Sequence, residues 1–456
     1  MSVEEKIDAI VSDVRLDGRV SSLLELMERL RVPGMSAAVV ADGRLEWAQG
    51  WGLREAGRPD RVAVETLFQA GSISKPVAAL CALKLVADEQ LDLEADVNDV
   101  LTSWNVPASG GWQPRVTLRQ LLSHTAGLTV HGFPGYARDE RTPTLVEVLD
   151  GNGNTPPVLV STMPGLQFSY SGGGYCVLQQ LLIDLTGMPF PQLARELVLE
   201  PLGMQDSTYE QPLPEQRWAQ AASGHRTGGK PVAGGWHVYP EMAAAGLWTT
   251  PSDLARFVIA IQRARSGAAD AILPQGLATE MLRSQALNKA IGLGVFIEGR
   301  GNALRFTHSG DDQGFIAELV GYVDNGLGAV VMASSDRGWM LIQSLLEAIG
   351  RVFEWPEYPP VEPEVVDVAE VDLEACVGVY ELPKGRSLTV ERRSDRLALT
   401  APGQAAVELC PASAGEWFVP ALKMTVTFVR EGASVRLAVI HQDADYVEDI
   451  AAQRAE

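Results

Sequence analysis

Apolar residues recur at helical spacing near the start of the chain and then give way to strand-like runs. Between residues 11 and 31 the spacing predicts one amphipathic helix. Its apolar positions are Leu23, Leu24, Leu26, Met27 and Leu30. Two apolar runs at 35–40 and 45–50 follow, and the turn between them contains Asp42-Gly43, a strong hairpin signal. An antiparallel sheet therefore begins early in the chain.

The next apolar stretch has no polar face. Residues 77–85 are nearly all apolar, which predicts a buried helix. Pro76 is tolerated only in the first turn of that helix, where no intrahelical N–H bond is lost. Ser72 therefore lies at or beside the helix start. Lys75 follows three residues later, so one helical turn brings its amine to the same face as the Ser72 hydroxyl.

The middle of the chain, from about 90 to 290, predicts mostly helices and long loops. They include a short helix at 117–124 and a helix that begins near Thr250, with a Thr cap and a proline in its first turn. Strands return at 292–298, 304–308, 315–323 and 327–334, and a long closing helix is predicted at 339–353. A sheet begun near the N-terminus and completed after 290 indicates an α+β fold, with a cleft where sheet and helical region meet.

A change in composition marks a second part of the chain. Four prolines interrupt an acidic stretch, which is typical of a stiff linker: Pro356, Pro359, Pro360 and Pro363. Eight short strand-like runs with turn residues follow and predict a small antiparallel β-barrel. We therefore expect a first domain at 1–355, a linker at 356–370 and a barrel domain at 371–456.

Composition and charge exclude several kinds of partner. The net charge of −21 makes phosphate backbones and anionic membrane surfaces unfavourable, so we expect no nucleic-acid or membrane binding. The four cysteines are scattered and form no Cys-x-x-Cys pair, so neither a zinc ribbon nor a redox motif is supported. No secretory signal is visible, and no apolar run approaches the roughly 18 residues that a spanning helix needs. These features predict a cytoplasmic protein.

Three short motifs are candidates for chemistry. The Ser72-x-x-Lys75 pair is a candidate activated nucleophile, because burial lowers the pKa of an amine and lets it accept a proton. Tyr170 precedes a glycine-rich turn into an apolar helix, and it is either a proton carrier beside the lysine or a structural turn residue. His308 ends a predicted strand, where a lone histidine is more often structural than functional.

In this order, the three motifs resemble those of the class C β-lactamase and penicillin-binding-protein superfamily, above all its esterase and D-aminopeptidase branches. The stretches at 124–128 and 245–254 support the resemblance, which spans roughly residues 20 to 350. The resemblance implies a serine hydrolase with a β-lactamase/transpeptidase-like sheet, without metal or cofactor. The C-terminal barrel resembles the lipocalin-like domain appended to some peptidases of this superfamily. No Gly-x-Ser-x-Gly elbow or His-Glu-x-x-His spacing supports a different hydrolase.

The resemblance also implies roles for individual residues. Ser72 would be the acylated nucleophile, and Lys75 and Tyr170 would share the general-base and general-acid work. The backbone N–H groups of Ser72 and Asp311 would form the oxyanion hole. An acyl-enzyme divides a hard cleavage into two easier steps, and fixed N–H donors stabilise the developing oxyanion.

Two positions depart from the β-lactamase pattern. His308 would complete the catalytic set, but it stands where β-lactamases have the lysine of Lys-Thr-Gly, and it carries at most partial charge at neutral pH. Gly172 stands where they have the asparagine of Tyr-x-Asn. The resemblance also gives Gly172, Ser309 and Gly310 a place in substrate binding. Both departures weaken the case for β-lactamase or transpeptidase activity.

Three functional hypotheses follow. The first is a serine hydrolase that cleaves small amides, short peptides, including those with D-residues, or carboxylic esters through an acyl-enzyme on Ser72. The second is a broad carboxylesterase or acyltransferase with weak β-lactamase activity. The third is a catalytically inactive ligand-binding homologue, which Gly172 keeps open because fold alone does not prove activity. The partner is in each case a small molecule or short peptide, and the sequence leaves room for a homo-oligomer.

Overall fold

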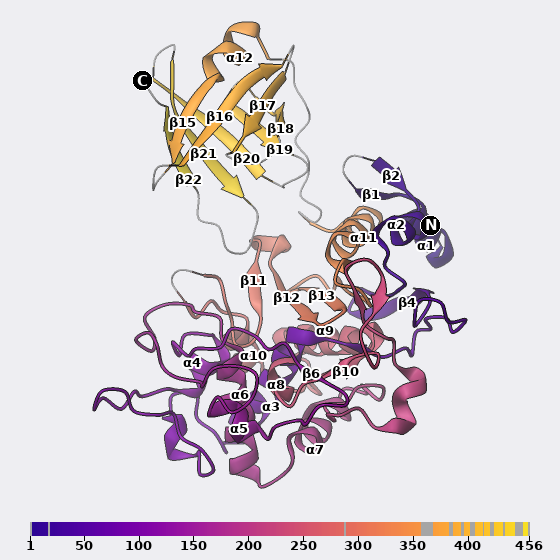
Figure 1. The fold of residues 1–456 in the computed structure, drawn as a ribbon, viewed down its shortest axis with the longest axis vertical. Helices are drawn as coiled ribbons and strands as arrows, with labels where there is room; N and C mark the ends of the chain where they lie inside the picture. Colours follow the sequence, from indigo (N-terminus) through magenta and orange to yellow (C-terminus); the bar gives the residue numbers. More distant parts are fainter. Residues whose placement is uncertain are drawn as a thin grey trace. The chain divides into compact units, whose positions relative to one another are not determined.

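The chain forms two compact units in the computed structural model, Met1–Val14 with Ser21–Pro356 and Arg15–Val20 with Glu357–Glu456. Figure 1 shows the elements of both. The residues that the structure describes are 2–16, 19–286, 289–356, 368–382, 386–393, 396–401, 406–413, 415–419, 424–431, 434–442 and 450–454.

A six-stranded antiparallel sheet is the centre of the first unit. Its strand order is β11-β12-β13-β14-β3-β4, so the early hairpin pairs with a strand made some three hundred residues later. The strands are β3 (Gly34–Ala41), β4 (Arg44–Gly52), β11 (Phe296–Glu298), β12 (Arg305–Asp312), β13 (Phe315–Tyr322) and β14 (Gly328–Ala333). The predicted α+β class and the predicted hairpin are both confirmed.

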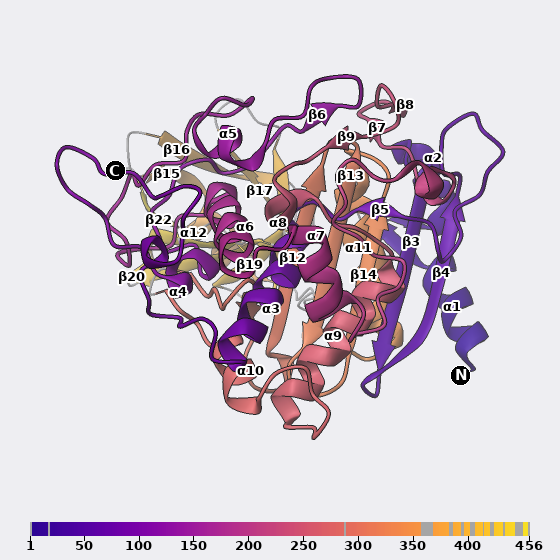
Figure 2. The ribbon, with the colours of Figure 1, turned by 90° about the horizontal axis from the view of Figure 1, so that it is seen from below.

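Two long helices pack on this sheet. The helix α9 (Pro251–Ser266) contacts β3, β4, β13 and β14, and Figure 2 shows it lying across the strands. The helix α11 (Gly338–Val352), predicted as the closing helix, contacts β13 and β14. Every position of β3, β13 and β14 is buried. Because side chains alternate along a strand, these strands must be covered on both faces.

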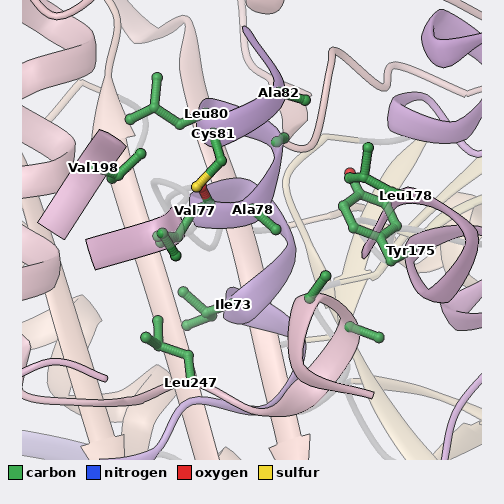
Figure 3. Packing of buried hydrophobic residues seen from close by; sticks show 14 of the residues in the cluster. Ile73, Val77, Ala78, Leu80, Cys81, Ala82, Tyr175, Leu178, Val198 and Leu247 are labelled. Carbon is green, nitrogen blue, oxygen red and sulfur yellow. The ribbon is translucent and has the colours of Figure 1, made fainter. Parts of the chain in front are cut away.

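The helical region of the first unit is built around α3 (Ser74–Ala87), which follows the 3₁₀ turn η1 (Gly71–Ile73). Its Val77, Ala78 and Leu80 are fully buried. Figure 3 shows Val77 and Leu80 on the side of α3 that faces Val198, and Ala78 on the side that faces Tyr175 and Leu178 of another helix. The surrounding helices are α4 (Leu118–Leu122), α5 (Leu145–Leu149), α6 (Gly172–Thr186), α7 (Phe190–Ala194), α8 (Met242–Ala245) and α10 (Gln275–Met281). The prediction of a buried helix beside Ser72 is confirmed.

Short elements connect these layers. They are β5 (Phe68–Gln69), β6 (Tyr136–Ala137), β7 (His225–Arg226), β8 (Lys230–Pro231), β9 (His237–Val238), β10 (Trp248–Thr249), the 3₁₀ turns η2 (Val97–Asp99), η4 (Glu215–Gln220) and η5 (Gly301–Ala303), and the π-helical turn η3 (Arg195–Leu199).

The strand predicted at 292–298 is wrong over its first part, since only β11 forms there. At Gly294 (φ 89°) an added Cβ would lie 2.5 Å from the Ala79 Cβ, so the chain instead turns closely past α3.

The single helix predicted at 11–31 is also wrong. That segment contains the end of α1 (Val3–Ser12), the hairpin strands β1 (Val14–Leu16) and β2 (Arg19–Ser21), and α2 (Leu23–Leu30). The reason is a capping box, in which the Ser22 side chain accepts the Glu25 N–H and the Glu25 side chain accepts the Ser22 N–H. This box starts a new helix at Leu23.

The second unit contains a closed antiparallel barrel, as predicted. Its strands are β15 (Gly378–Leu382), β16 (Arg386–Arg393), β17 (Arg396–Thr400), β18 (Val407–Pro411), β19 (Glu416–Val419), β20 (Met424–Glu431), β21 (Ser434–Gln442) and β22 (Ile450–Arg454). Pairing of β15 with β22 closes it, and Tyr380 and Trp417 are fully buried inside. The helix α12 (Glu370–Cys376) was not predicted.

Residues 357–367, most of the predicted linker, lie outside the described residues. Among the described helices none combines the length and apolarity needed to cross a bilayer.

The core around α3 generates a stability prediction. Leu80→Ala should lower the free energy of unfolding of the first unit by about 2–5 kcal/mol, because it leaves a cavity in a fully buried helix. Urea unfolding followed by tryptophan fluorescence would measure the change. The matched control is Leu24→Ala on α2, whose side chain is 59% exposed and whose replacement should change stability by no more than about 0.5 kcal/mol. Equal losses in both variants would contradict the packing shown here.

Candidate active site

Ser72 and Lys75 meet at the start of α3. Lys75 Nζ lies 2.8 Å from Ser72 Oγ and donates a second hydrogen bond of 2.8 Å to the Ala244 carbonyl oxygen. The Lys75 side chain is only 2% exposed, and burial lowers its pKa to about 7. At neutral pH a large fraction of this amine is therefore unprotonated. An unprotonated amine at this distance can accept the proton of the serine hydroxyl.

The end of β12 approaches the backbone of η1 very closely. A Cβ atom added at Gly310 would overlap the Ala70 carbonyl oxygen and lie 3.3 Å from Ser72 N. A Cβ atom added at Gly71, where φ is 50°, would lie 2.5 Å from Asp311 N. Glycine at both positions therefore lets the amide nitrogens of Ser72 and Asp311 come close together. Two backbone N–H groups in such proximity can bind an oxyanion.

Tyr170 also contacts the nucleophile. Its side chain hydrogen-bonds Ser72, and its ring centroid lies 5.1 Å from Lys75 Nζ. Burial raises the pKa of the phenol above its ordinary value. The phenol therefore stays protonated and can donate or relay a proton, whereas the lysine amine is the base available at neutral pH.

His308 is a neutral hydrogen-bond acceptor in this site. Its Nδ1 lies 2.7 Å from the Ser309 carbonyl oxygen, and a carbonyl only accepts, so Nδ1 carries the proton. Its buried Nε2 has no hydrogen-bond partner among the described residues. Burial, followed by the charge of Lys75, lowers the pKa of His308 to about 3. The ring lies 6.4 Å from Tyr170 and 5.4 Å from Phe296, centroid to centroid. It therefore cannot supply the positive charge of the lysine it replaces.

Gly172 is covered rather than open to a ligand. A Cβ atom added at this position would lie 2.8 Å from Phe133 Cε2 and 3.0 Å from the His131 carbonyl oxygen. Gly172 is buried, whereas Phe133 is half-buried. Phe133 thus takes up part of the space that an asparagine side chain at this position would need.

The structure brings together most of the predicted side chains and adds residues that sequence reasoning missed. Ser72, Lys75, Tyr170 and His308 lie together in the structure, and the glycine at 310 allows the two backbones to approach each other. The missed residues are His124, whose ring stacks on Tyr170, the Phe296 and Phe133 rings, and the Ala244 carbonyl. Of these, His124 and Ala244 lie in or next to stretches that supported the family resemblance, which was the available signal.

Two buried carboxyl groups also lie near the site. Asp312 accepts a hydrogen bond from the Gly71 backbone, and burial raises its pKa. Glu241 is fully buried, and neither carboxyl oxygen has a hydrogen-bond partner in the described part of the chain. Burial raises the pKa of Glu241 to about 8. Within the described ranges no three His, Cys, Asp or Glu side chains are grouped as a metal site would require.

Known proteins are similar to this chain in sequence and in fold. The family model described as Beta-lactamase matches residues 22–343. Esterase EstB of Burkholderia gladioli is 32% identical over 334 residues, 65% of this chain and 79% of that protein. Penicillin-binding protein 4 of Amycolatopsis lactamdurans is 28% identical over 382 residues, 78% of this chain and 94% of that protein. The solved structure of the octameric penicillin-binding protein homologue from Pyrococcus abyssi has a TM-score of 0.64 at 20% identity, covering 99% of this chain and all of that one, and it shows the shared fold.

The Lys75 amine generates a pH prediction. The rate at which a fluorophosphonate modifies Ser72 should rise with pH and level off, with a midpoint near 7, because only the unprotonated amine accepts the hydroxyl proton. The measurement is the pseudo-first-order rate between about pH 5.5 and 9.5 with mass analysis of the Ser72 peptide. In Lys75→Ala this rise should be absent. A rise that persists in Lys75→Ala would assign it to another buried group, such as Glu241.

Proposed function

The chain belongs to the Beta-lactamase family and is a serine hydrolase, and we propose that it cleaves small carboxylic esters and amides, short peptides included, through an acyl-enzyme on Ser72. The observation that carries the proposal is the 2.8 Å contact between Ser72 Oγ and the buried Lys75 Nζ. A catalytically inactive binding protein has no need to keep a desolvated amine against a serine hydroxyl, since burying that amine costs free energy.

Acylation would begin with proton transfer from the Ser72 hydroxyl to the unprotonated Lys75 amine. Ser72 Oγ attacks the substrate carbonyl carbon, and the carbonyl π electrons move onto oxygen. The N–H groups of Ser72 and Asp311 bind this oxyanion, which is the position that the close approach of β12 and η1 provides. When the carbonyl re-forms, the bond to the leaving oxygen or nitrogen breaks. The leaving group takes a proton from the Tyr170 phenol, and Lys75 returns one to Tyr170.

Deacylation would use the same groups with water as the nucleophile. Lys75, again unprotonated, accepts a proton from water through Tyr170 or directly, and the hydroxide oxygen attacks the acyl carbon. Collapse of the second oxyanion breaks the bond to Ser72 Oγ and returns the proton to it. The acid product leaves and the starting state is restored, so protons balance over one cycle.

The surroundings of the nucleophile favour substrates without a carboxylate next to the scissile bond. His308 is neutral and offers only an acceptor nitrogen, so it attracts an N–H or O–H group of a substrate rather than an anion. Glycine at 172 offers no side-chain amide to bind a substrate carbonyl, and the Phe133 ring lies where such a side chain would extend. Both features support ester and simple amide substrates over penicillins, which carry a carboxylate.

The nucleophile assignment has a direct test. Ser72→Ala should reduce turnover of a short-chain nitrophenyl ester to background, a loss of roughly 10⁴–10⁶-fold, because no oxygen remains to be acylated. Steady-state kinetics would measure the loss, and mass analysis of the wild-type Ser72 peptide would detect the acyl group. Ser266→Ala, at the exposed end of α9, serves as the matched serine control and should keep full activity. Substantial turnover by Ser72→Ala would refute the assignment.

The covered glycine generates a second test. Gly172→Asn should lower folding stability by about 1–3 kcal/mol and reduce ester hydrolysis, because the new side chain overlaps Phe133. Gly172→Asn combined with Phe133→Ala should recover part of both losses, since the overlap with the Phe133 ring is removed. Thermal unfolding and kcat/KM on the ester and on benzylpenicillin would be measured together. In the wild type, kcat/KM on the penicillin should fall well below that on the ester. The reverse order, or no recovery in the double variant, would contradict this account of the site.

A further inference from the structure

His124 bonds to the backbone on both sides of Tyr170. The N–H of Ser169 donates to the His124 carbonyl oxygen at 2.8 Å. The N–H of Ser171 donates to His124 Nδ1 at 3.1 Å. The residues before and after the phenol are thus both held by one histidine, the first through its main chain and the second through its ring.

The imidazole ring of His124 also lies against the phenol itself. The two ring centroids are 4.2 Å apart with an interplanar angle of 26°, a stacked arrangement. His124 is 3% exposed, and Phe168 and Tyr175 contact its ring from other directions at 6.0 and 5.2 Å. Packing on these sides leaves the imidazole little freedom to rotate, so the stacked Tyr170 ring is held by a fixed surface.

The hydrogen bonds determine the protonation of this ring. Nδ1 accepts the Ser171 N–H and therefore has a free lone pair, so in the neutral ring the proton is on Nε2. Burial holds the pKa of His124 well below its ordinary value, and the positive charge of Lys75, when it is protonated, acts in the same direction. The ring remains a neutral acceptor while Lys75 gains and loses its proton.

The backbone at His124 does not explain the choice of histidine. Its φ of 55° is left-handed, and it follows the C-cap residue Ser123 at the end of α4. Glycine is the usual residue at such a position, with asparagine next, because other side chains are strained there. A histidine is tolerated here at a cost in free energy, and the contacts of its ring with Ser171 and Tyr170 are what glycine could not supply.

We propose that His124 is a positioning residue for Tyr170, and that its ring fixes the phenol against Ser72 through the stack and the bond to the Ser171 N–H. The inference rests on the proposed function, in which Tyr170 passes a proton between Lys75 and the leaving group. Proton transfer requires hydrogen-bond contact, so a small displacement of the phenol slows the chemistry without removing any reacting group. The stretch at 124–128, which supported the family resemblance without a role of its own, thereby acquires one.

The test is a double-mutant cycle on nitrophenyl ester hydrolysis. His124→Gly relieves the backbone strain and removes the ring, and it is made both in the wild type and in Tyr170→Phe. With Tyr170 present, kcat should fall about 10–100-fold while KM stays within about threefold. In the Tyr170→Phe background the same change should lower kcat by less than about threefold, because no phenolic proton remains to be positioned. Equal fold-losses in the two backgrounds would overturn the proposal, since a purely structural role weakens both equally.

Two further variants keep the test informative if the glycine variant is unstable. His124→Asn tolerates the left-handed backbone, and its Oδ1 can accept the Ser171 N–H, so its kcat should exceed that of His124→Gly. His124→Phe keeps an aromatic ring but leaves the Ser171 N–H without its acceptor, so its kcat should lie below that of His124→Asn. Each is measured in both Tyr170 backgrounds and must show the same dependence on the phenol. Arg31→Gly changes a left-handed residue after α2, far from this site in the chain, and should leave kcat unchanged.

Failure of this inference can be told apart from failure of the proposed function. If Tyr170→Phe alone keeps the wild-type kcat, the proton-transfer role of Tyr170 is wrong, and the positioning proposal is overturned with it. If Tyr170→Phe loses activity but the losses at His124 multiply with it, the proposed function stands and only the positioning role is refuted.

Discussion

The active site depends on keeping an amine inside an apolar core. Lys75 lies on α3, whose residues are buried on nearly every side, so water cannot solvate its ammonium form. Within the described part of the chain, Lys75 Nζ hydrogen-bonds to Ser72 Oγ, just before α3, and to the carbonyl oxygen of Ala244 on α8. A buried amine without partners would be costly. The Lys75 side chain therefore requires both η1 and α8 to lie within hydrogen-bond distance of its amine.

The groups around that amine are kept largely uncharged. His124 and His308 are neutral because burial lowers the pKa of each, and burial raises the pKa values of Glu241 and Asp312. A fully ionised carboxylate beside Lys75 would favour the ammonium and remove the base. Desolvation is the largest influence on every one of these groups. The same apolar packing that stabilises the fold thus sets the proton affinity of the nucleophile's partner.

Elements determined by a few neighbouring residues could be predicted from the sequence. The Asp42-Gly43 hairpin, the buried run of α3 and the barrel strands follow from turn residues and apolar spacing within a few positions. The prediction of a single helix at 11–31 was wrong, because it followed the apolar spacing and gave too little weight to the capping residue Ser22, which starts a new helix. Phe133 packs over Gly172, and the His124 ring stacks on Tyr170. Both contacts join residues that are distant in sequence. Such contacts leave no periodic trace, so motif order could locate the reacting groups but not the residues that hold them.

The pairing of β3 with β14 has a consequence for how the protein is made. β3 is buried at every position only when β14 lies beside it, and β14 begins at Gly328. A ribosome adds about 5–20 residues per second, so the early hairpin waits on the order of tens of seconds for its neighbour. During that interval its apolar edge is an open template for pairing with other chains. Until β14 emerges, the edge of this hairpin is therefore the part of the sheet most open to pairing with another chain, and the exposed interval lengthens as synthesis slows.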